Sequence, residues 1–279
     1  MRRLAFRPLW KRDTIRPLCN ASGLGYQHES HQDDAESSIN QETDTRKVLY
    51  NQHIPTTNFQ RAALAFGSAF AALNDPRRHV MVADLGEATG QFALERLRSK
   101  MNADPSGRQI LRERPRIHSS VVNLDKLRNF PEDSFGKAYV QFLDTNEITP
   151  DSRMPVRFVD DEELAYVMTR YREIHDFVHT LLGLSISVPN EIIVKWFEMI
   201  QTGLPMCMLG SFFGPLKLSL GDNFILTRYY IPWVVNTARK AKSVMNVYFE
   251  KQFDRPIETL RQELNITIPP NVPFEGKYI

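Results

Sequence analysis

The stretch VDDEELAYVMTRYREIHDFVHTLLG, residues 159–183, decides the fold class. Asp160 is a favourable helix N-cap, the three acidic residues after it suit the positive end of a helix dipole, and Gly183 follows as a stop. Between these ends, apolar side chains recur every three to four positions, which predicts an amphipathic helix over Asp161–Leu182. Its inward face comprises Leu164, Met168, Tyr171, His175, Val178 and Leu182.

This inward face carries two histidines. His175 and His179 lie one helical turn apart on it. Asp176 lies about 100° around the helix from His175, at the edge of the face. The three side chains are therefore expected to converge on one point.

The next helix begins after a short connection, with Ser187 as its expected cap and Pro189 in its first turn. Such a connection favours an antiparallel neighbour. At about 1.5 Å per residue, Glu191 lies about 5 Å up this second helix, and His179 lies at a similar height on the first. We therefore expect the glutamate to meet the histidines.

Two imidazoles and two carboxylates form a mixed nitrogen and oxygen ligand set. This set suits Zn²⁺, and it also suits Fe²⁺, Mn²⁺ or Co²⁺, so the ligands do not fix the metal. Paired inward histidines can equally be hydrogen-bonded core residues, and Glu191 can simply favour a helix N-terminus. Spacing alone leaves both interpretations open. The candidate ligands are His175, Asp176, His179 and Glu191.

Helical periodicity continues from Thr57 to the C-terminal region, with Gly and Pro between segments and few runs of β-branched residues. This pattern predicts an all-α fold: a single multi-helix domain with a metal site on an antiparallel helix pair. No internal repeat is evident. Further helices are expected over Asn58–Leu73, Gln91–Met101, Ser106–Arg112, Ser134–Leu143, Pro189–Thr202, Asn223–Phe253 with a candidate break near Pro232, and Pro256–Leu264.

The longest uncharged stretch, Met199–Leu216, approaches the length of a membrane-spanning helix. Glycines and prolines interrupt it, so a continuous transmembrane helix is not expected. One interpretation is a buried turn between two helices. The other is an apolar wall that accommodates an isoprenoid tail or rests in a lipid interface, for which Met208 and Phe212 provide suitable side chains.

The composition excludes several classes of protein. An apolar fraction of 42% over 279 residues is ample for a buried core, so a disordered chain is not expected. The net charge is only +2 and no basic stripe is interleaved with aromatic residues, which argues against a nucleic-acid surface. Cys19 and Cys207 stand far apart and form no Cys-x-x-Cys pair, which excludes a disulfide framework and fits a reducing compartment.

The N-terminal region differs in composition from the rest. Residues 1–26 carry six basic side chains against one acid, with large apolar residues interspersed, which is typical of a transit peptide. The alternative is a disordered basic tail that carries no targeting signal. Residues 27–45 contain no Lys or Arg and almost no large apolar side chain, so we expect a flexible polar linker over 27–52. The folded domain is expected over 53–279.

The candidate ligand motif resembles one known family. His175-Asp176-Phe177-Val178-His179, followed after eleven residues by Glu191, is similar to the His-Asp-x-x-His-x₁₁-Glu motif of the coenzyme Q biosynthesis protein four family, which is mitochondrial. The resemblance runs from about His53 to the C-terminus. Flanking segments that also carry it are Gly86–Gly90, Arg157–Tyr166, Gly203–Cys207 and Phe213–Pro215.

The resemblance implies an all-helical fold and makes His175, Asp176, His179 and Glu191 metal ligands. It implies a peripheral location on the matrix side of the mitochondrial inner membrane, in a complex with other coenzyme Q biosynthesis enzymes. Its implied partners are polyprenylated benzoate or phenol intermediates and the lipid surface, and a homo-oligomer remains open. The implied reaction is a lyase reaction, oxidative or not: loss of the C1 carboxylate from 4-hydroxy-3-methoxy-5-polyprenylbenzoate gives 2-methoxy-6-polyprenylphenol.

This reaction needs electron density at C1, which a phenolate oxygen para to C1 supplies best. We hypothesise that the metal binds the ring hydroxyl, with or without its methoxy neighbour, as Lewis acid and template. Four protein ligands would complete a tetrahedral structural zinc site, so this mechanism needs either an expanded coordination shell or a displaced ligand. Asp176, which lies furthest round the helix, is the ligand expected to move. No residue is singled out as the acid that protonates C1. Arg112, Arg114 and Arg116 are candidates for binding the substrate carboxylate, with a solvated surface as the alternative.

Two other functions compete with this one. The first is a non-catalytic, lipid-binding organiser of the same complex, whose metal is structural. The second is a metal-dependent phosphohydrolase built on a His-Asp pair. That site would need further ligands from separate helices, and His79 and His118 lack a matching Asp pattern.

Overall fold

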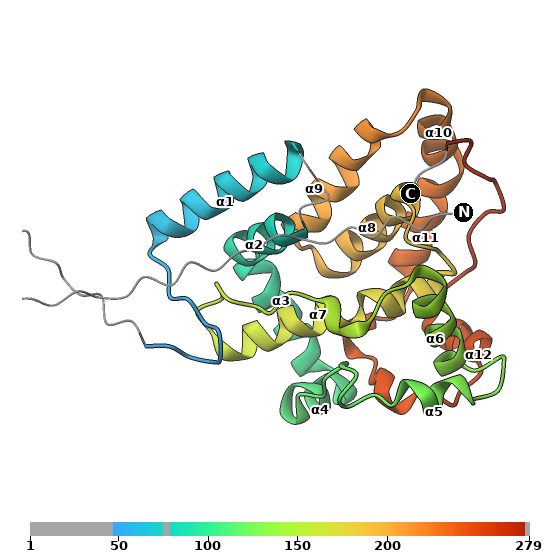
Figure 1. Ribbon diagram of the computed structural model, residues 1–279, viewed down its shortest axis with the longest axis horizontal. Helices are drawn as coiled ribbons and strands as arrows, with labels where there is room; N and C mark the ends of the chain where they lie inside the picture. The colour runs from blue at the N-terminus through green and yellow to red at the C-terminus, as the bar shows by residue number, and fades with distance from the viewer. Residues whose placement is uncertain (1–46, 75–78, 277–279) are drawn as a thin grey trace, which may run out of the picture. The chain divides into compact units, whose positions relative to one another are not determined.

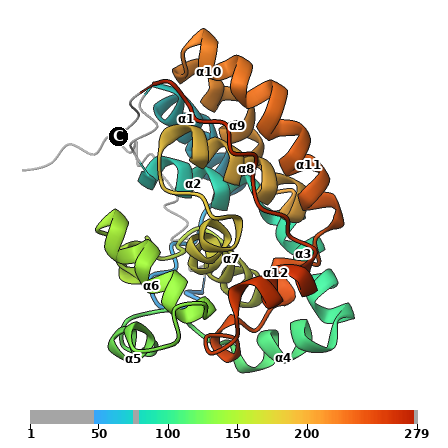
Figure 2. The same ribbon diagram turned by 90° about the vertical axis from the view of Figure 1, so that its right-hand side faces the viewer.

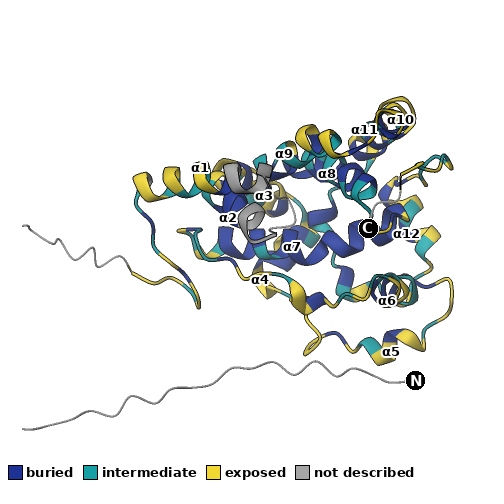
Figure 3. Ribbon diagram, turned by 45° about the horizontal axis from the view of Figure 1, so that its top comes forward, coloured by how far each residue is buried: buried dark blue, intermediate teal, exposed yellow. Residues whose placement is uncertain are grey.

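The helix predicted from residues 159–183 lies in the middle of the other helices in the computed structural model (Figures 1 and 2). The structure describes residues 47–74 and 79–276, so the expected transit peptide and most of the expected linker lie outside the described residues. This helix, α7, spans Glu162–Leu182, and from Leu164 onward it is buried on nearly every side (Figure 3). The predicted inward stripe is therefore only part of its buried surface.

The described residues form helices and loops without a β-strand, which confirms the all-α prediction. Residues Thr45–Ile279 form one compact unit. Its helices are α1 (Asn58–Asn74), α2 (His79–Thr89), α3 (Gln91–Ala103), α4 (Pro105–Glu113), α5 (Leu124–Arg128), α6 (Phe135–Asn146), α7, α8 (Val188–Thr202), α9 (Pro205–Phe213), α10 (Leu220–Ile225), α11 (Ile231–Lys240) and α12 (Ile257–Leu264). Short 3₁₀ turns include η2 (Gly214–Lys217).

The N-terminal end of α7 differs from the prediction by one residue. Asp161, not Asp160, is the N-cap, and its carboxylate accepts a hydrogen bond from the Leu164 amide at 2.8 Å. Asp160 instead contacts the His53 ring at 2.9 Å. Gly183 ends the helix as predicted, at a φ of 69° that glycine adopts without strain.

The connection between α7 and α8 is as short as predicted, since α8 begins at Val188. Ser187 occupies the N-cap position, as predicted, although its side chain makes no capping hydrogen bond. Glu191 lies in the first turn of α8. The short connection thereby places Glu191 next to the last two turns of α7, where the histidines lie.

Two helical predictions were wrong. The helix expected to reach Phe253 ends at Lys240, because the backbone is extended at Ala241 and the Lys242 amide bonds to the Leu264 carbonyl instead. Pro232 does not break the helix; a π-helical turn over Leu226–Tyr230 precedes it and joins α10 to α11.

The helix α2 was not predicted from the sequence. It contains Gly86, which lowers helix propensity. A Cβ atom at Gly86 would lie 2.3 Å from the Met206 sulfur, so the glycine lets α2 and α9 approach closely. Tertiary packing therefore favours a helix that local sequence does not indicate.

Specific packing begins slightly before the expected domain start. The Tyr50 hydroxyl donates a hydrogen bond to the Val159 carbonyl at 2.9 Å, and His53 is 6% exposed. These contacts fasten the residues before α1 to the segment that leads into α7.

The stretch Met199–Leu216 is divided among the end of α8, α9 and η2. Within 47–74 and 79–276, no helix has both the length and the apolar character needed to cross a membrane. The expectation of an interrupted segment is confirmed for these residues.

Candidate metal centre

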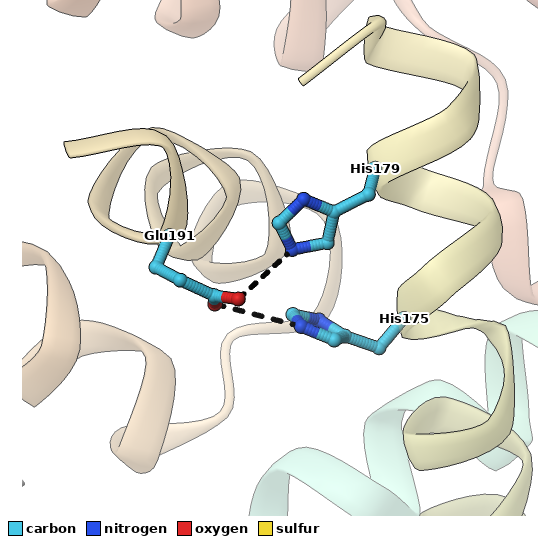
Figure 4. Close-up of side chains that lie close together, drawn as sticks. All are labelled: His175, His179 and Glu191. Atoms are coloured by element: carbon cyan, nitrogen blue, oxygen red, sulfur yellow. Dashed lines mark ion pairs between the residues drawn. The ribbon is translucent and has the colours of Figure 1, made fainter. Parts of the chain in front are cut away.

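Three of the four predicted ligands lie together. His175 and His179 project from α7 toward Glu191 of α8 (Figure 4). The His175 Nε2 and Glu191 Oε2 atoms are 3.6 Å apart, and the His179 Nε2 and Glu191 Oε1 atoms are 3.3 Å apart. One candidate ligand atom from each residue lies within 4.8 Å of the other two. We call these residues the triad.

Glu191 is the most exposed side chain of the triad. The His179 side chain is 0% exposed and that of His175 is 7% exposed, whereas that of Glu191 is 37% exposed. A small molecule would therefore approach past Glu191, with the imidazoles behind it.

The triad fits a divalent metal ion. The Nε2 atom of His179 is buried and has no hydrogen-bond partner among the described residues, which is rare for a polar atom in a protein interior. Two imidazole nitrogens and a carboxylate oxygen match the ligands of catalytic zinc sites, which keep a further position open. Metal bonds of about 2 Å would require small rotations that draw the three ligand atoms closer together.

Asp176 does not lie with the triad. Its carboxylate is 3% exposed and forms an ion pair with Arg153, whose side chain is 34% exposed. To bind the same ion, Asp176 would have to leave this partner. Its role as a ligand therefore stays a prediction, and the structure adds the contact that would have to break.

The sequence analysis did not identify the groups that contact the Nδ1 atoms of the two histidine rings, on the side away from Glu191. The His175 Nδ1 atom lies 2.6 Å from the Oε1 atom of Glu198, and the His179 Nδ1 atom lies 3.1 Å from the Leu184 carbonyl oxygen. Lys195 donates to Glu198 at 2.6 Å. The signal was present in the spacing, because residues four and seven positions after Glu191 share its helix face.

Charges in this region act on one another. Burial would raise the pKa of the Glu191 carboxyl, but the imidazoles of His175 and His179 beside it hold that pKa well below its usual range. Burial also opposes ionisation of Glu198, yet the charges of His175 and Lys195 lower its pKa. Burial would lower the pKa of His175, and the charge of Glu198 raises it instead. A proton on His175 would thus compete with a bound cation.

The three arginines proposed for the substrate carboxylate are engaged elsewhere. Arg114 pairs with Glu162 at 2.5 Å, Arg116 with Glu173 at 2.7 Å, and Arg112 with Glu113 at 3.4 Å. No contact among the described residues joins them to the triad. The solvated-surface interpretation fits their positions better.

The stretch after α8 packs back against α8, at residues that follow Glu191 on that helix. A Cβ atom at Gly210 would lie 3.0 Å from Cγ of Lys195, and one at Gly214 would lie 2.6 Å from Cγ1 of Ile192. The inner side of α9 is buried, but large apolar side chains cover its outer side and continue onto α10. We call these exposed residues the apolar ridge: Met208 (46% exposed), Phe212 (58%), Phe213 (44%), Leu216 (80%), Leu220 (91%) and Phe224 (62%).

The phosphohydrolase alternative gains no support. His118 lies 3.3 Å from Asp151, but its side chain is 48% exposed. Within the described residues, the triad is the group of His, Cys, Asp and Glu side chains whose geometry could hold a metal.

Comparison with known proteins gives a consistent assignment. The family model described as Coenzyme Q (ubiquinone) biosynthesis protein Coq4 matches residues 50–270. A mitochondrial ubiquinone biosynthesis protein COQ4 homolog from Bos taurus is 56% identical over 223 residues, which is 80% of this chain and 84% of the relative. Its Homo sapiens counterpart is 49% identical over 259 residues, 93% of this chain and 96% of the relative.

A solved structure shares the fold. It is the crystal structure of a Nostoc punctiforme protein assigned by its name to ubiquinone biosynthesis, with a TM-score of 0.60. The match covers 75% of this chain and 99% of the other at 20% sequence identity, so it bears on the fold alone.

Proposed function

The chain belongs to the coenzyme Q (ubiquinone) biosynthesis protein Coq4 family and acts in coenzyme Q biosynthesis, and from that premise we propose that it decarboxylates a polyprenylated hydroxybenzoate. The substrate we propose is 4-hydroxy-3-methoxy-5-polyprenylbenzoate. The observation that carries the proposal is the triad, whose glutamate is partly exposed and lies on the helix against which α9 and η2, two of the elements that carry the apolar ridge, are packed.

In this reaction the bond between C1 and the carboxylate breaks, CO₂ leaves, and C1 takes up a proton to give 2-methoxy-6-polyprenylphenol. The electron pair left at C1 is best accommodated when the para oxygen is a phenolate before the bond breaks. A divalent metal bound at the triad, for which Zn²⁺ is our first choice and Fe²⁺, Mn²⁺ or Co²⁺ are alternatives, would supply the Lewis acidity that favours the phenolate.

The protein's own residues would hold the ion and orient the ring. His175 and His179 offer their Nε2 atoms and Glu191 offers a carboxylate oxygen from the more exposed side. We propose Asp176 as a fourth ligand when it leaves Arg153. Because the buried imidazoles exclude water from behind, the substrate would enter past Glu191.

We further propose that the apolar ridge binds the polyprenyl tail or rests on the matrix face of the mitochondrial inner membrane. Burial of one CH₂ group contributes about 0.8 kcal/mol, so a partly enclosed tail could supply most of the substrate's affinity. Charge supports a lipid surface. From Met199 to Lys240 the one acidic residue is Asp222, which is 0% exposed, whereas Lys217 and Arg228 are exposed and can attract anionic headgroups.

The family also suggests a place within a complex of coenzyme Q biosynthesis enzymes, which the chain would help to organise. A non-catalytic version of that role is the alternative: the metal would be structural, and the ridge would present polyprenylated intermediates to the enzymes. The exposed ridge supports both versions, because binding a tail does not require chemistry.

Product analysis distinguishes them. Purified protein loaded with Zn²⁺ or Co²⁺ is incubated with the polyprenylbenzoate, and the aromatic product and CO₂ are measured. We expect stoichiometric CO₂ and 2-methoxy-6-polyprenylphenol, and none with His179→Ala. Tight binding of the benzoate by metal-loaded protein without any product would support the organiser and contradict the decarboxylase.

A further inference from the structure

Glu198 is a buried carboxylate that a three-residue metal site does not require. It lies on α8 and its side chain is 2% exposed. One oxygen, Oε1, lies 2.6 Å from the His175 Nδ1 atom. The other, Oε2, accepts hydrogen bonds from Lys195 at 2.6 Å and from the Tyr171 hydroxyl at 2.9 Å. Both oxygens are therefore occupied, and the carboxylate is held from two helices.

This contact fixes which nitrogen of His175 carries hydrogen. An ionised carboxylate can only accept hydrogen bonds, so a contact of 2.6 Å between Glu198 Oε1 and His175 Nδ1 requires a hydrogen on Nδ1. A neutral imidazole with hydrogen on Nδ1 has its free electron pair on Nε2. That Nε2 atom is the one facing Glu191, at 3.6 Å.

His179 is oriented in the same sense but by a weaker partner. Its Nδ1 atom lies 3.1 Å from the Leu184 carbonyl oxygen, which also only accepts. The longer contact to a neutral oxygen contrasts with the short contact to a charged one. Charge-assisted hydrogen bonds are about twice as strong as neutral ones, so His175 is the more firmly held of the two rings.

We propose that Glu198 is a positioning residue that fixes His175 as a donor through Nε2, and that Lys195 and Tyr171 keep Glu198 in place for this purpose. The consequence for metal binding rests on the proposed function, whereas the ring orientation does not. Partners that orient a histidine ligand in this way also make its nitrogen a better donor, and their removal lowers metal affinity about 10- to 100-fold in known sites.

The competing explanation is a structural ion pair. Lys195 and Glu198 are three positions apart on α8 and could stabilise the fold without regard to His175. A matched control exists on α7, where the fully buried Arg170 pairs with Glu250 away from the triad. Glu250→Gln therefore removes a partly buried charge, 14% exposed, that pairs with a buried cation, without touching any proposed ligand.

The test has a reading that needs no metal. Nitrogen-15 NMR of the metal-free full chain at alkaline pH reports which ring nitrogen of His175 carries hydrogen. We expect hydrogen on Nδ1 in the wild type and in Glu250→Gln, and a shift toward hydrogen on Nε2 in Glu198→Ala. Hydrogen on Nε2 of His175 in the wild type would overturn the proposal whatever the protein binds.

The second reading is Co²⁺ affinity, measured by competition with a chromophoric chelator, together with the visible absorption of the bound ion. Glu198→Gln keeps the shape and an acceptor oxygen but loses the charge, so we expect about tenfold weaker binding and an altered spectrum, with up to about 100-fold weaker binding for Glu198→Ala. Tyr171→Phe, which leaves both charges in place, should fall between Glu198→Gln and the wild type. Glu250→Gln should match the wild type.

The outcomes separate this proposal from the metal site itself. If both Glu198 variants fold, as judged by thermal melting, and bind Co²⁺ with wild-type affinity and spectrum, Glu198 is only half of a structural ion pair. If the wild type binds no Co²⁺ while His175 shows hydrogen on Nδ1, the metal proposal fails and the ring orientation by Glu198 stands.

Discussion

The interior between α7 and α8 and the neighbouring apolar ridge depart from ordinary protein architecture in opposite ways. In the interior, ionisable groups are buried, as with Glu198 at 2% exposure. On the ridge, large apolar groups are exposed, as with Leu220 at 91%. Buried charges require partners, and contiguous exposed apolar groups usually mark a binding surface. Lys195 lies between the two regions: it donates a hydrogen bond to Glu198, and its side chain packs beside Gly210 of α9, the helix that carries part of the ridge.

The two regions should therefore respond differently to substitutions. In the interior every group depends on a specific partner at a specific atom, so removing one ligand should abolish its function. On the ridge each side chain adds its own buried area, so losses should accumulate gradually. The substitutions below are designed to contradict or refine that contrast.

His179→Ala should have the largest effect. It removes an imidazole whose Nε2 atom is buried without a hydrogen-bond partner among the described residues, so we expect the folded variant to lose most of its metal and its function in coenzyme Q biosynthesis. Elemental analysis of purified protein measures the metal. His118→Ala, at an exposed histidine outside the triad, is the matched control. Full metal content in His179→Ala would remove this residue from the site.

The double variant Leu216→Asp/Leu220→Asp should weaken binding to vesicles that contain anionic lipid. Each leucine contributes about 1.5 kcal/mol or more when buried, so we expect roughly 100-fold weaker binding with unchanged metal content. Phe212→Asp and Met208→Asp should act less strongly, because these side chains are already partly buried.

Val121→Asp is the control for the ridge, because Val121 is 65% exposed on a loop of another part of the fold. Flotation of vesicles with bound protein measures the effect. Carbonate should release the wild-type protein from membranes, and failure to do so would make the peripheral interpretation wrong. Normal lipid binding by the double variant would show that the ridge does not contribute to membrane binding.

Asp176→Asn should have a smaller effect on metal affinity than His179→Ala. Asp176 must leave Arg153 to bind an ion, so part of its contribution is lost in breaking that pair. We expect a decrease on the order of tenfold, measured by metal competition. Arg153→Gln, which frees the carboxylate, should not weaken metal binding. Wild-type metal affinity in Asp176→Asn would mean that Asp176 is not a ligand and only forms the ion pair with Arg153.

Deletion of residues 1–45 should change stability least. These residues have a polar or basic sequence without a buried pattern, so we expect an unchanged melting temperature, together with loss of mitochondrial import. Tyr50→Ala should lower the melting temperature, because it removes a hydrogen bond to Val159. A large decrease in the deletion variant would show that this segment stabilises the domain.

Helix ends and spacing made much of the fold accessible from sequence. The boundaries of α7 were predicted to within one residue because a run of acidic residues from Asp160 and the glycine at 183 have strong local preferences, although Asp161 rather than Asp160 is the cap. The approach of Glu191 to the histidines followed from the short connection between α7 and α8, which favours an antiparallel pair of helices. By contrast, α2 contains Gly86, which packs against Met206, and this contact joins residues far apart in the chain.

The rest of the site depended on contacts that spacing does not encode. Asp176 had the right position on α7, but Arg153, from the loop before it, binds its carboxylate. Glu198 shares the face of Glu191, yet its contact with His175 requires the exact approach of two helices. The exposure of Leu216 and Leu220 could not be read from an apolar sequence, which is equally typical of a core.

The most direct test of the central claim measures metal content and product in one set of samples. Purified protein is stripped of metal, reloaded with Zn²⁺ to graded occupancy, and given 4-hydroxy-3-methoxy-5-polyprenylbenzoate. The account predicts that 2-methoxy-6-polyprenylphenol forms in proportion to occupied triads and is absent in Glu191→Gln. Product formation that does not depend on occupancy, or its absence at full occupancy with bound substrate, would contradict it.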